Sequence, residues 1–177
     1  LAELGVYNLS VSVYMVLITL VGASIPLTIS KITASNKTLH CEHKTQYSVT
    51  SSLIMTSGFS LLISALLLIS KPLLTIIIGD PIGYYIIISL IPSIVFTAIY
   101  SQIRGYLWGI ENYFAVSIVE FVEQILRIAF CIVFVLTGWF SSPIIAVGMS
   151  LSIACTLSTT YGIILYIKNG GRFRYKN

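Results

Sequence analysis

The chain has 177 residues, of which 56% are hydrophobic and 9% are charged, and its net charge is +4 at pH 7. Its mean hydropathy of +0.95 excludes an ordinary soluble globular domain. The basic residues lie between long apolar runs, where they set membrane topology, so we do not expect nucleic acid as a partner. The sequence predicts one integral membrane domain over residues 1–177.

Five apolar runs are long enough to cross a bilayer, which takes about 20 helical residues. The predicted transmembrane helices cover residues 7–29, 49–70, 83–103, 113–137 and 143–167. A shorter apolar segment, residues 73–78, cannot span and is predicted to lie in the outer interface or to dip into it. The predicted fold class is therefore all-α and polytopic.

The positive charges between the spans predict an orientation. Eight of them share one side of the membrane: Lys31, Lys37, Lys44, Arg104, Lys168, Arg172, Arg174 and Lys176. The other side has Lys71 alone, so the positive-inside rule places the N-terminus outside and the C-terminus in the cytoplasm. A chain that begins outside with no Met and no signal peptide also leads us to expect an earlier span upstream.

The fourth span contains ionisable residues within an apolar run. Helical periodicity places Glu120, Glu123, Gln124 and Arg127 on one stripe. A charge at the bilayer centre costs about 2.5–3.5 kcal/mol on insertion scales, so this stripe must face protein or water. Glu123 and Arg127, spaced i, i+4, could form a structural ion pair within the protein, or the stripe could line a transport pathway.

Prolines and small residues indicate helix shape and packing. Pro26 and Pro92 predict kinks in the first and third spans. Small residues recur at every fourth position of the second and fifth spans: Ser52, Thr56, Ser60 and Ser64, then Gly148, Ser152, Thr156 and Thr160. Such stripes are typical of close helix packing in lipid, with substrate contact as the alternative.

The sequence lacks the motifs of an enzyme. Asp80 is its only aspartate, and the nucleophile-elbow, zinc-protease and P-loop patterns are missing. The loop His40-Cys41-Glu42-His43 contains metal-ligand residue types without a second pair, so we expect neither a metal site nor a cofactor.

Several motifs resemble a known family. Residues 3–7 and 25–31, then Arg104-Gly105-Tyr106-Leu107-Trp108-Gly109 and residues 123–127, resemble in order the first-loop, second-helix, inner-loop and fifth-helix patterns of polysaccharide flippases of the stage V sporulation protein B type. Trp108 stands where these flippases often have glutamine. Their superfamily also contains the multidrug and toxic-compound extruders and the lipid II flippase.

The resemblance implies an architecture of about fourteen helices in two lobes around a central cavity, working by alternating access. The five spans of this chain would be helices two to six, most of the first lobe. Lys31 and Arg104 would then lie at cytoplasmic helix ends, where a pyrophosphate head group enters, or would serve only as topology anchors.

The leading hypothesis is a flippase, not an enzyme, that moves a lipid-linked saccharide precursor of a cell wall, spore wall or exopolysaccharide across the cytoplasmic membrane. Its expected partners are that substrate, membrane lipids and a coupling cation. The expected substrate-binding residues are Lys31, Arg104, Glu120, Glu123, Gln124 and Arg127. The alternatives are a cation-coupled multidrug extruder, a membrane-embedded polysaccharide ligase or acyltransferase, and a structural membrane component.

Overall fold

The computed structural model describes residues 2–22, 25–39, 42–78, 81–140 and 142–173. Within these ranges the elements are seven helices and no strand, which confirms the all-α prediction. The helices are α1 (Ala2–Gly22), α2 (Ile25–Thr38), α3 (Glu42–Ile69), α4 (Lys71–Ile78), α5 (Pro81–Gly109), α6 (Tyr113–Thr137) and α7 (Pro143–Lys168).

Most of these helices are long enough to cross a membrane, as a polytopic protein requires. Among the described residues, four segments meet both the length and the hydropathy that a span needs: Gly5–Thr38, His43–Ile69, Gly83–Gly109 and Pro143–Lys168. Helix α6, with 25 residues, is also long enough to span a membrane, but its three charged residues, Glu120, Glu123 and Arg127, set it apart from these four segments. Its bounds, Tyr113–Thr137, are those predicted from the sequence.

The first predicted span, residues 7–29, falls on two described helices with residues 23 and 24 outside the described residues, so the predicted kink at Pro26 stays a prediction. Helix α1 ends at Gly22, and α2 begins at Ile25 and continues to Thr38. Pro26 is the second described residue of α2 and is buried. Pro92, by contrast, lies inside α5, which continues through it.

Two other helices extend beyond their apolar runs. Helix α3 begins at Glu42 rather than at residue 49, and α5 ends at Gly109 rather than at residue 103. Hydropathy marks the stretch suited to lipid, whereas the hydrogen bonds of a helix continue into polar sequence. The short apolar segment forms α4, whose eight residues are too few to cross a bilayer, as predicted.

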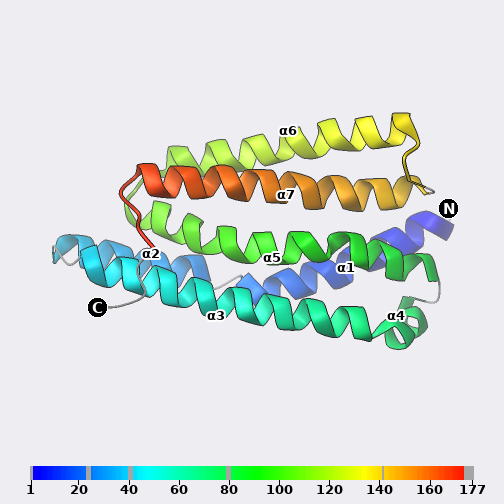
Figure 1. The fold of residues 1–177 in the computed structure, drawn as a ribbon, viewed down its shortest axis with the longest axis horizontal. Helices are drawn as coiled ribbons and strands as arrows, with labels where there is room; N and C mark the ends of the chain where they lie inside the picture. The colour runs from blue at the N-terminus through cyan, green and yellow to red at the C-terminus, as the bar shows by residue number, and fades with distance from the viewer. Residues whose placement is uncertain (1, 23–24, 40–41, 79–80, 141, 174–177) are drawn as a thin grey trace.

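Helix α5 occupies the centre of the bundle. It packs against α1, α2 and α3 on one side and against α7 on the other, while α6 packs mainly against α7 (Figure 1). Ile86, Leu90 and Ile94 of α5 are almost fully buried in the core that this arrangement creates. Helix α5 thus holds together the two groups of helices.

Two glycines permit the close crossing of α2 and α5. A Cβ added at Gly105 would lie 2.8 Å from the Pro26 carbonyl oxygen and 2.9 Å from the Cβ of Ile29. One at Gly109 would collide with Thr33. The Arg104-Gly105 motif, which the resemblance assigns to an inner loop, therefore lies within α5, and its glycine serves helix packing.

The small-residue stripes lie largely at helix interfaces, which fits their expected packing role. Ser60 and Ser64 of α3 are buried, and Ser152 of α7 donates a hydrogen bond to the Ser89 carbonyl of α5. Gln102, fully buried on α5, joins the α3 stripe to the centre: it accepts from Ser52 at 2.9 Å and donates to Thr56 at 3.0 Å. The more exposed Thr160 bonds only within its own helix.

One end of the bundle collects most of the positive charge. The last turns of α2 and α7, the first turn of α3 and the junction of α5 with α6 lie together there (Figure 1). Lys37, Lys44 and Lys168 belong to these segments, whereas Lys71 begins α4 at the opposite end. Arg174 and Lys176 lie outside the described residues. The charge grouping agrees with the predicted topology, and which end faces the cytoplasm stays a prediction.

Candidate functional site

A pocket of about 280 Å³ lies between α5, α6 and α7, and we call it the charged pocket. It is lined by Thr97, Tyr100, Arg104, Glu120, Glu123, Gln124, Cys155 and Thr159. Four of the six residues predicted to bind substrate therefore meet around one cavity: Arg104, Glu120, Glu123 and Gln124.

An ion pair joins α5 to α6 at this pocket. The Arg104 Nη1 atom lies 3.3 Å from the Glu120 Oε1 atom, and both side chains are partly exposed, at 32% and 47%. The guanidinium also lies 5.0 Å from the ring centroid of Trp108, one turn along α5. Arg104 is thus held between a carboxylate and an aromatic face, and the tryptophan that departs from the family pattern supplies that face.

Glu123 is bound to α7. Its carboxylate accepts a hydrogen bond from Ser158 Oγ at 3.1 Å and from Cys155 Sγ at 3.5 Å. One of the two alternatives for the stripe, an internal pair between Glu123 and Arg127, is not seen: in the part of the chain that the structure describes, Arg104 with Glu120 is the only ion pair. The polar face of α7 offers donors at a better position than the arginine one turn further along α6.

Arg127 takes a different partner and faces a different cavity. Its guanidinium donates to the Gln124 side chain, and its side chain is exposed. It lines a second pocket of about 390 Å³, whose walls come from α1, α5, α6 and α7 and are mainly apolar. Because Gln124 lines the charged pocket, the Arg127–Gln124 hydrogen bond connects the rims of the two cavities.

Two polar atoms at the charged pocket have no hydrogen-bond partner among the described residues. They are the Tyr100 hydroxyl and the Arg104 Nε atom, both buried. A buried donor without a partner costs about 1–3 kcal/mol. The unpaired hydroxyl of Tyr100, whose side chain is only 6% exposed, therefore offers a ready donor for a ligand in this pocket.

Lys31 is not part of this site. It lies exposed on α2 and does not line the charged pocket. Arg104 also lies within α5, short of the end to which the resemblance assigns it. The two basic residues expected to meet a head group together are therefore separate in the structure.

Four residues of the charged pocket were not predicted from the sequence: Thr97, Tyr100, Cys155 and Thr159. A signal for them exists in the spacing along α5 and α7. Thr97, Tyr100 and Arg104 follow the i, i+3, i+7 pattern of one helix face, as Cys155 and Thr159 follow i, i+4. A search of the sequence for polar residues on the same helix face as Arg104 would therefore have found Thr97 and Tyr100.

No group of three or more metal-ligating side chains occurs among the residues that the structure describes. The predicted absence of a metal in the His40–His43 loop stays a prediction, since His40 and Cys41 lie outside those residues.

Comparisons with known proteins match the whole chain to one family. A family model described as "Polysaccharide biosynthesis protein" matches residues 1–177. Stage V sporulation protein B from Bacillus subtilis (strain 168) is 27% identical over 126 residues, which are 71% of this chain and 24% of that protein. The match thus spans about a quarter of that relative's length. No solved structure matches the chain.

Proposed function

We propose that this chain, which belongs to the polysaccharide biosynthesis protein family, forms part of a flippase for a lipid-linked saccharide precursor. The family match confirms the resemblance seen in the sequence, and the long apolar helices fit a multi-pass membrane protein. The name of the Bacillus subtilis relative refers to sporulation, so a spore wall precursor is one candidate substrate, beside precursors of a cell wall or an exopolysaccharide. Transport of this kind needs no covalent step and no enzyme chemistry.

The observation that supports the proposal is the charged pocket itself. It places Arg104, an unpaired Tyr100 hydroxyl and two carboxylates between three helices, with Arg127 at its rim. Guanidinium groups form strong paired hydrogen bonds with phosphates, and such contacts strengthen where water is scarce. In this proposal Arg104 exchanges Glu120 for a phosphate of the lipid carrier. Glu120 balances Arg104 when the pocket is empty.

The direct test replaces the ion pair as a unit in the full-length protein, as Arg104→Met with Glu120→Gln. A partly exposed ion pair contributes about 0–1 kcal/mol, so the double variant is expected to reach normal membrane abundance and melting temperature. Flipping should fall by about tenfold or more, because a charge-assisted hydrogen bond contributes about 1.5–3 kcal/mol. Flipping is measured as complementation of a flippase-deficient strain.

Lys168→Gln is the matched control, since it removes one exposed positive charge of α7 away from the charged pocket. It should complement like the wild type. A double variant that is stable and fully active would remove the ion pair from the mechanism.

A second candidate, a cation-coupled extruder of the same superfamily, is favoured by one specific observation. The charged pocket contains two carboxylates, Glu120 and Glu123, but only one guanidinium, Arg104. An excess of negative charge suits a cationic ligand or coupling ion. Binding to the full-length protein separates the two: lipophilic cations compete only in an extruder, whereas an anionic lipid-linked saccharide competes only in a flippase.

A further inference from the structure

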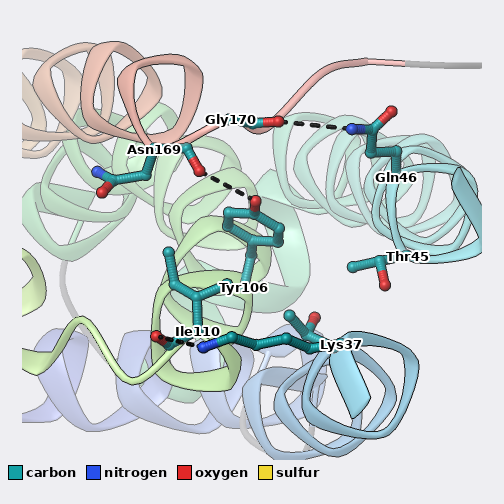
Figure 2. A pocket seen from close by; sticks show the side chains of 8 residues that line it. Lys37, Thr45, Gln46, Tyr106, Ile110, Asn169 and Gly170 are labelled. Atoms are coloured by element: carbon teal, nitrogen blue, oxygen red, sulfur yellow. Dashed lines mark hydrogen bonds between the residues drawn. The ribbon is translucent and has the colours of Figure 1, made fainter. Parts of the chain in front are cut away.

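A separate pocket of about 270 Å³ lies at the end of the bundle where the basic residues gather (Figure 2). We call it the basic-end pocket. It is lined by Thr33 and Lys37 of α2, Thr45 and Gln46 of α3, Tyr106 and Ile110 at the end of α5, and Asn169 and Gly170 after α7. Its lining residues are all different from those of the charged pocket.

Three main-chain acceptors on the wall of this pocket already have side-chain donors. Three carbonyl oxygens accept side-chain hydrogen bonds, shown as dashed lines in Figure 2. The pairs are Tyr106 to Asn169 at 3.3 Å, Gln46 to Gly170 at 3.4 Å and Lys37 to Ile110 at 3.5 Å. These bonds fix the wall, because they tie α2, α3 and α5 to one another and to the segment after α7.

Two donor groups on the wall, those of Lys37 and Thr33, have hydrogen-bonding capacity left. The Lys37 ammonium has three N–H groups and makes one long hydrogen bond, to Ile110. The Thr33 hydroxyl, on a side chain only 2% exposed, has no hydrogen-bond partner among the described residues. A hydroxyl buried without a partner is destabilising, so a ligand that accepts a hydrogen bond from it would recover this loss.

The charges around the pocket point to an anionic ligand. The eight lining residues include Lys37 and neither Asp nor Glu. Thr45 and Gln46 lie in or next to the first turn of α3, so the positive end of that helix dipole is close. A ligand that suits this wall brings a negative charge and several acceptor oxygens.

We propose that the basic-end pocket binds a phosphate group, with Lys37 as its cation and Thr33 as a hydroxyl donor. The volume exceeds the roughly 30 Å³ of one water several-fold, which is enough for a phosphate and part of a head group. The group can come from the head of an anionic phospholipid, since the pocket lies at the end of the membrane-spanning helices, or from free inorganic phosphate. The proposal does not depend on the charged pocket or on flipping.

The test measures binding to the full-length protein in a phosphate-free maltoside detergent, by titrating its melting temperature. One arm adds phosphatidylglycerol, with zwitterionic phosphatidylcholine as the lipid control. The other arm adds inorganic phosphate, with chloride at equal ionic strength as the salt control. A saturable response to phosphatidylglycerol assigns the lipid head group, and a response to phosphate assigns the free ion.

The variants are Lys37→Gln and Thr33→Val, with Lys44→Gln as the matched control. Lys44 is an exposed lysine in the first turn of α3 at the same end of the bundle, and it does not line the pocket. Lys37→Gln should weaken binding about tenfold, which is about 1.4 kcal/mol, and Thr33→Val by several-fold. Lys44→Gln should bind within about twofold of the wild type.

Stability without ligand separates binding from folding. Lys37 is exposed, so its replacement should not unfold the protein. Thr33→Val keeps the shape that packs against Gly109 and removes an unpaired buried hydroxyl, so its ligand-free melting temperature should equal or exceed that of the wild type. The proposal is overturned if the wild type shows no saturable response to either probe. It is also overturned if Lys37→Gln or Thr33→Val keeps wild-type affinity, or if Lys44→Gln loses as much.

Discussion

The Ser158 hydroxyl donates a hydrogen bond to the Glu123 carboxylate at 3.1 Å, which ties a charged residue of α6 to the face of α7. This contact gives the carboxylate a protein partner in a region where lipid offers none. Arg127 does not bond to Glu123 but to Gln124, so the two charged residues make different contacts. The stability of α6 against α7 and the function of its charged stripe can therefore be tested separately.

The first prediction concerns this contact. Glu123→Gln and Ser158→Ala should each lower the melting temperature of the full-length protein, and a double-mutant cycle should give a coupling of about 0.6 kcal/mol, as polar contacts in membranes do on average. Ser117→Ala is the control, because Ser117 is exposed on the same helix and bonds only to the Tyr113 carbonyl. Additive effects of the two replacements would show that the bond does not stabilise the protein.

The second prediction concerns the crossing of α2 and α5. Gly105→Ala would place a methyl group 2.8 Å from the Pro26 carbonyl oxygen, against backbone that cannot move aside as a side chain can. We expect a loss of about 1–3 kcal/mol, typical of overpacking. Gly58→Ala is the matched control: Gly58 also lies within a helix, but its added Cβ meets nothing within 4 Å. It should be neutral or gain up to about 1 kcal/mol from helix propensity.

A melting temperature for Gly105→Ala equal to that of the wild type would mean that α2 and α5 can move apart without a loss of stability. The thermal unfolding curves of the two glycine variants, measured side by side in the same detergent, decide the question.

The sequence predicts α6 well because its ends have local causes. The Asn112 side chain accepts from the Ala115 N–H at the start, and Gly138 adopts a left-handed conformation, φ 62°, at the end. Residues 7–29 were predicted as one span, and its described parts belong to α1 and α2, with residues 23 and 24 outside the described residues. Hydropathy reports burial in lipid, whereas the packing of α1 and α2 against α5 depends on contacts between residues distant in the sequence.

The candidate site also shows which features local sequence patterns predict and which depend on tertiary contacts. Periodicity placed Glu120, Glu123, Gln124 and Arg127 on one face; the structure brings the first three to one pocket, whereas Arg127 lines another. Periodicity could not show that Ser158 lies opposite Glu123, because that contact joins residues of different helices. Arg127 was the nearest candidate partner for Glu123 in the sequence, but in the structure the carboxylate accepts hydrogen bonds from Ser158 and Cys155 of α7.

The third prediction separates Arg127 from stability. Its guanidinium is exposed and bonds to Gln124 of its own helix, an arrangement that contributes about 0.3–0.5 kcal/mol between neighbouring turns. Arg127→Ala should thus leave the melting temperature of the full-length protein nearly unchanged. If Arg127 serves the proposed pathway, flipping by the same variant should fall about tenfold or more.

The two measurements give opposite outcomes for the two roles of Arg127. A loss of about 3–5 kcal/mol would indicate that the arginine compensates a buried charge, as in a sequestered pair. Normal melting together with normal complementation would exclude it from the pathway.

The last prediction is the orientation of the bundle. Lys168 is the last residue of α7, at the end of the bundle where α2 ends and α3 begins, while Trp139 follows α6 at the opposite end (Figure 1). Positive residues next to membrane spans are retained on the cytoplasmic side, so the end with Lys168 should be cytoplasmic and the end with Trp139 outside. The charge asymmetry of the sequence also predicts that Cys41, which lies outside the described residues, is on the cytoplasmic side.

The measurement uses full-length protein in which Cys41, Cys131 and Cys155 are replaced by alanine and one cysteine is added, as Lys168→Cys or Trp139→Cys. Both positions are exposed. A membrane-impermeant maleimide applied to intact cells should label Trp139→Cys and miss Lys168→Cys, and inverted vesicles should reverse the pattern. Restoring Cys41 alone should reproduce the Lys168→Cys result. Labelling of Lys168→Cys from outside would reverse the orientation and would place the basic-end pocket at the outer surface, where the anionic lipids of the cytoplasmic leaflet cannot reach it.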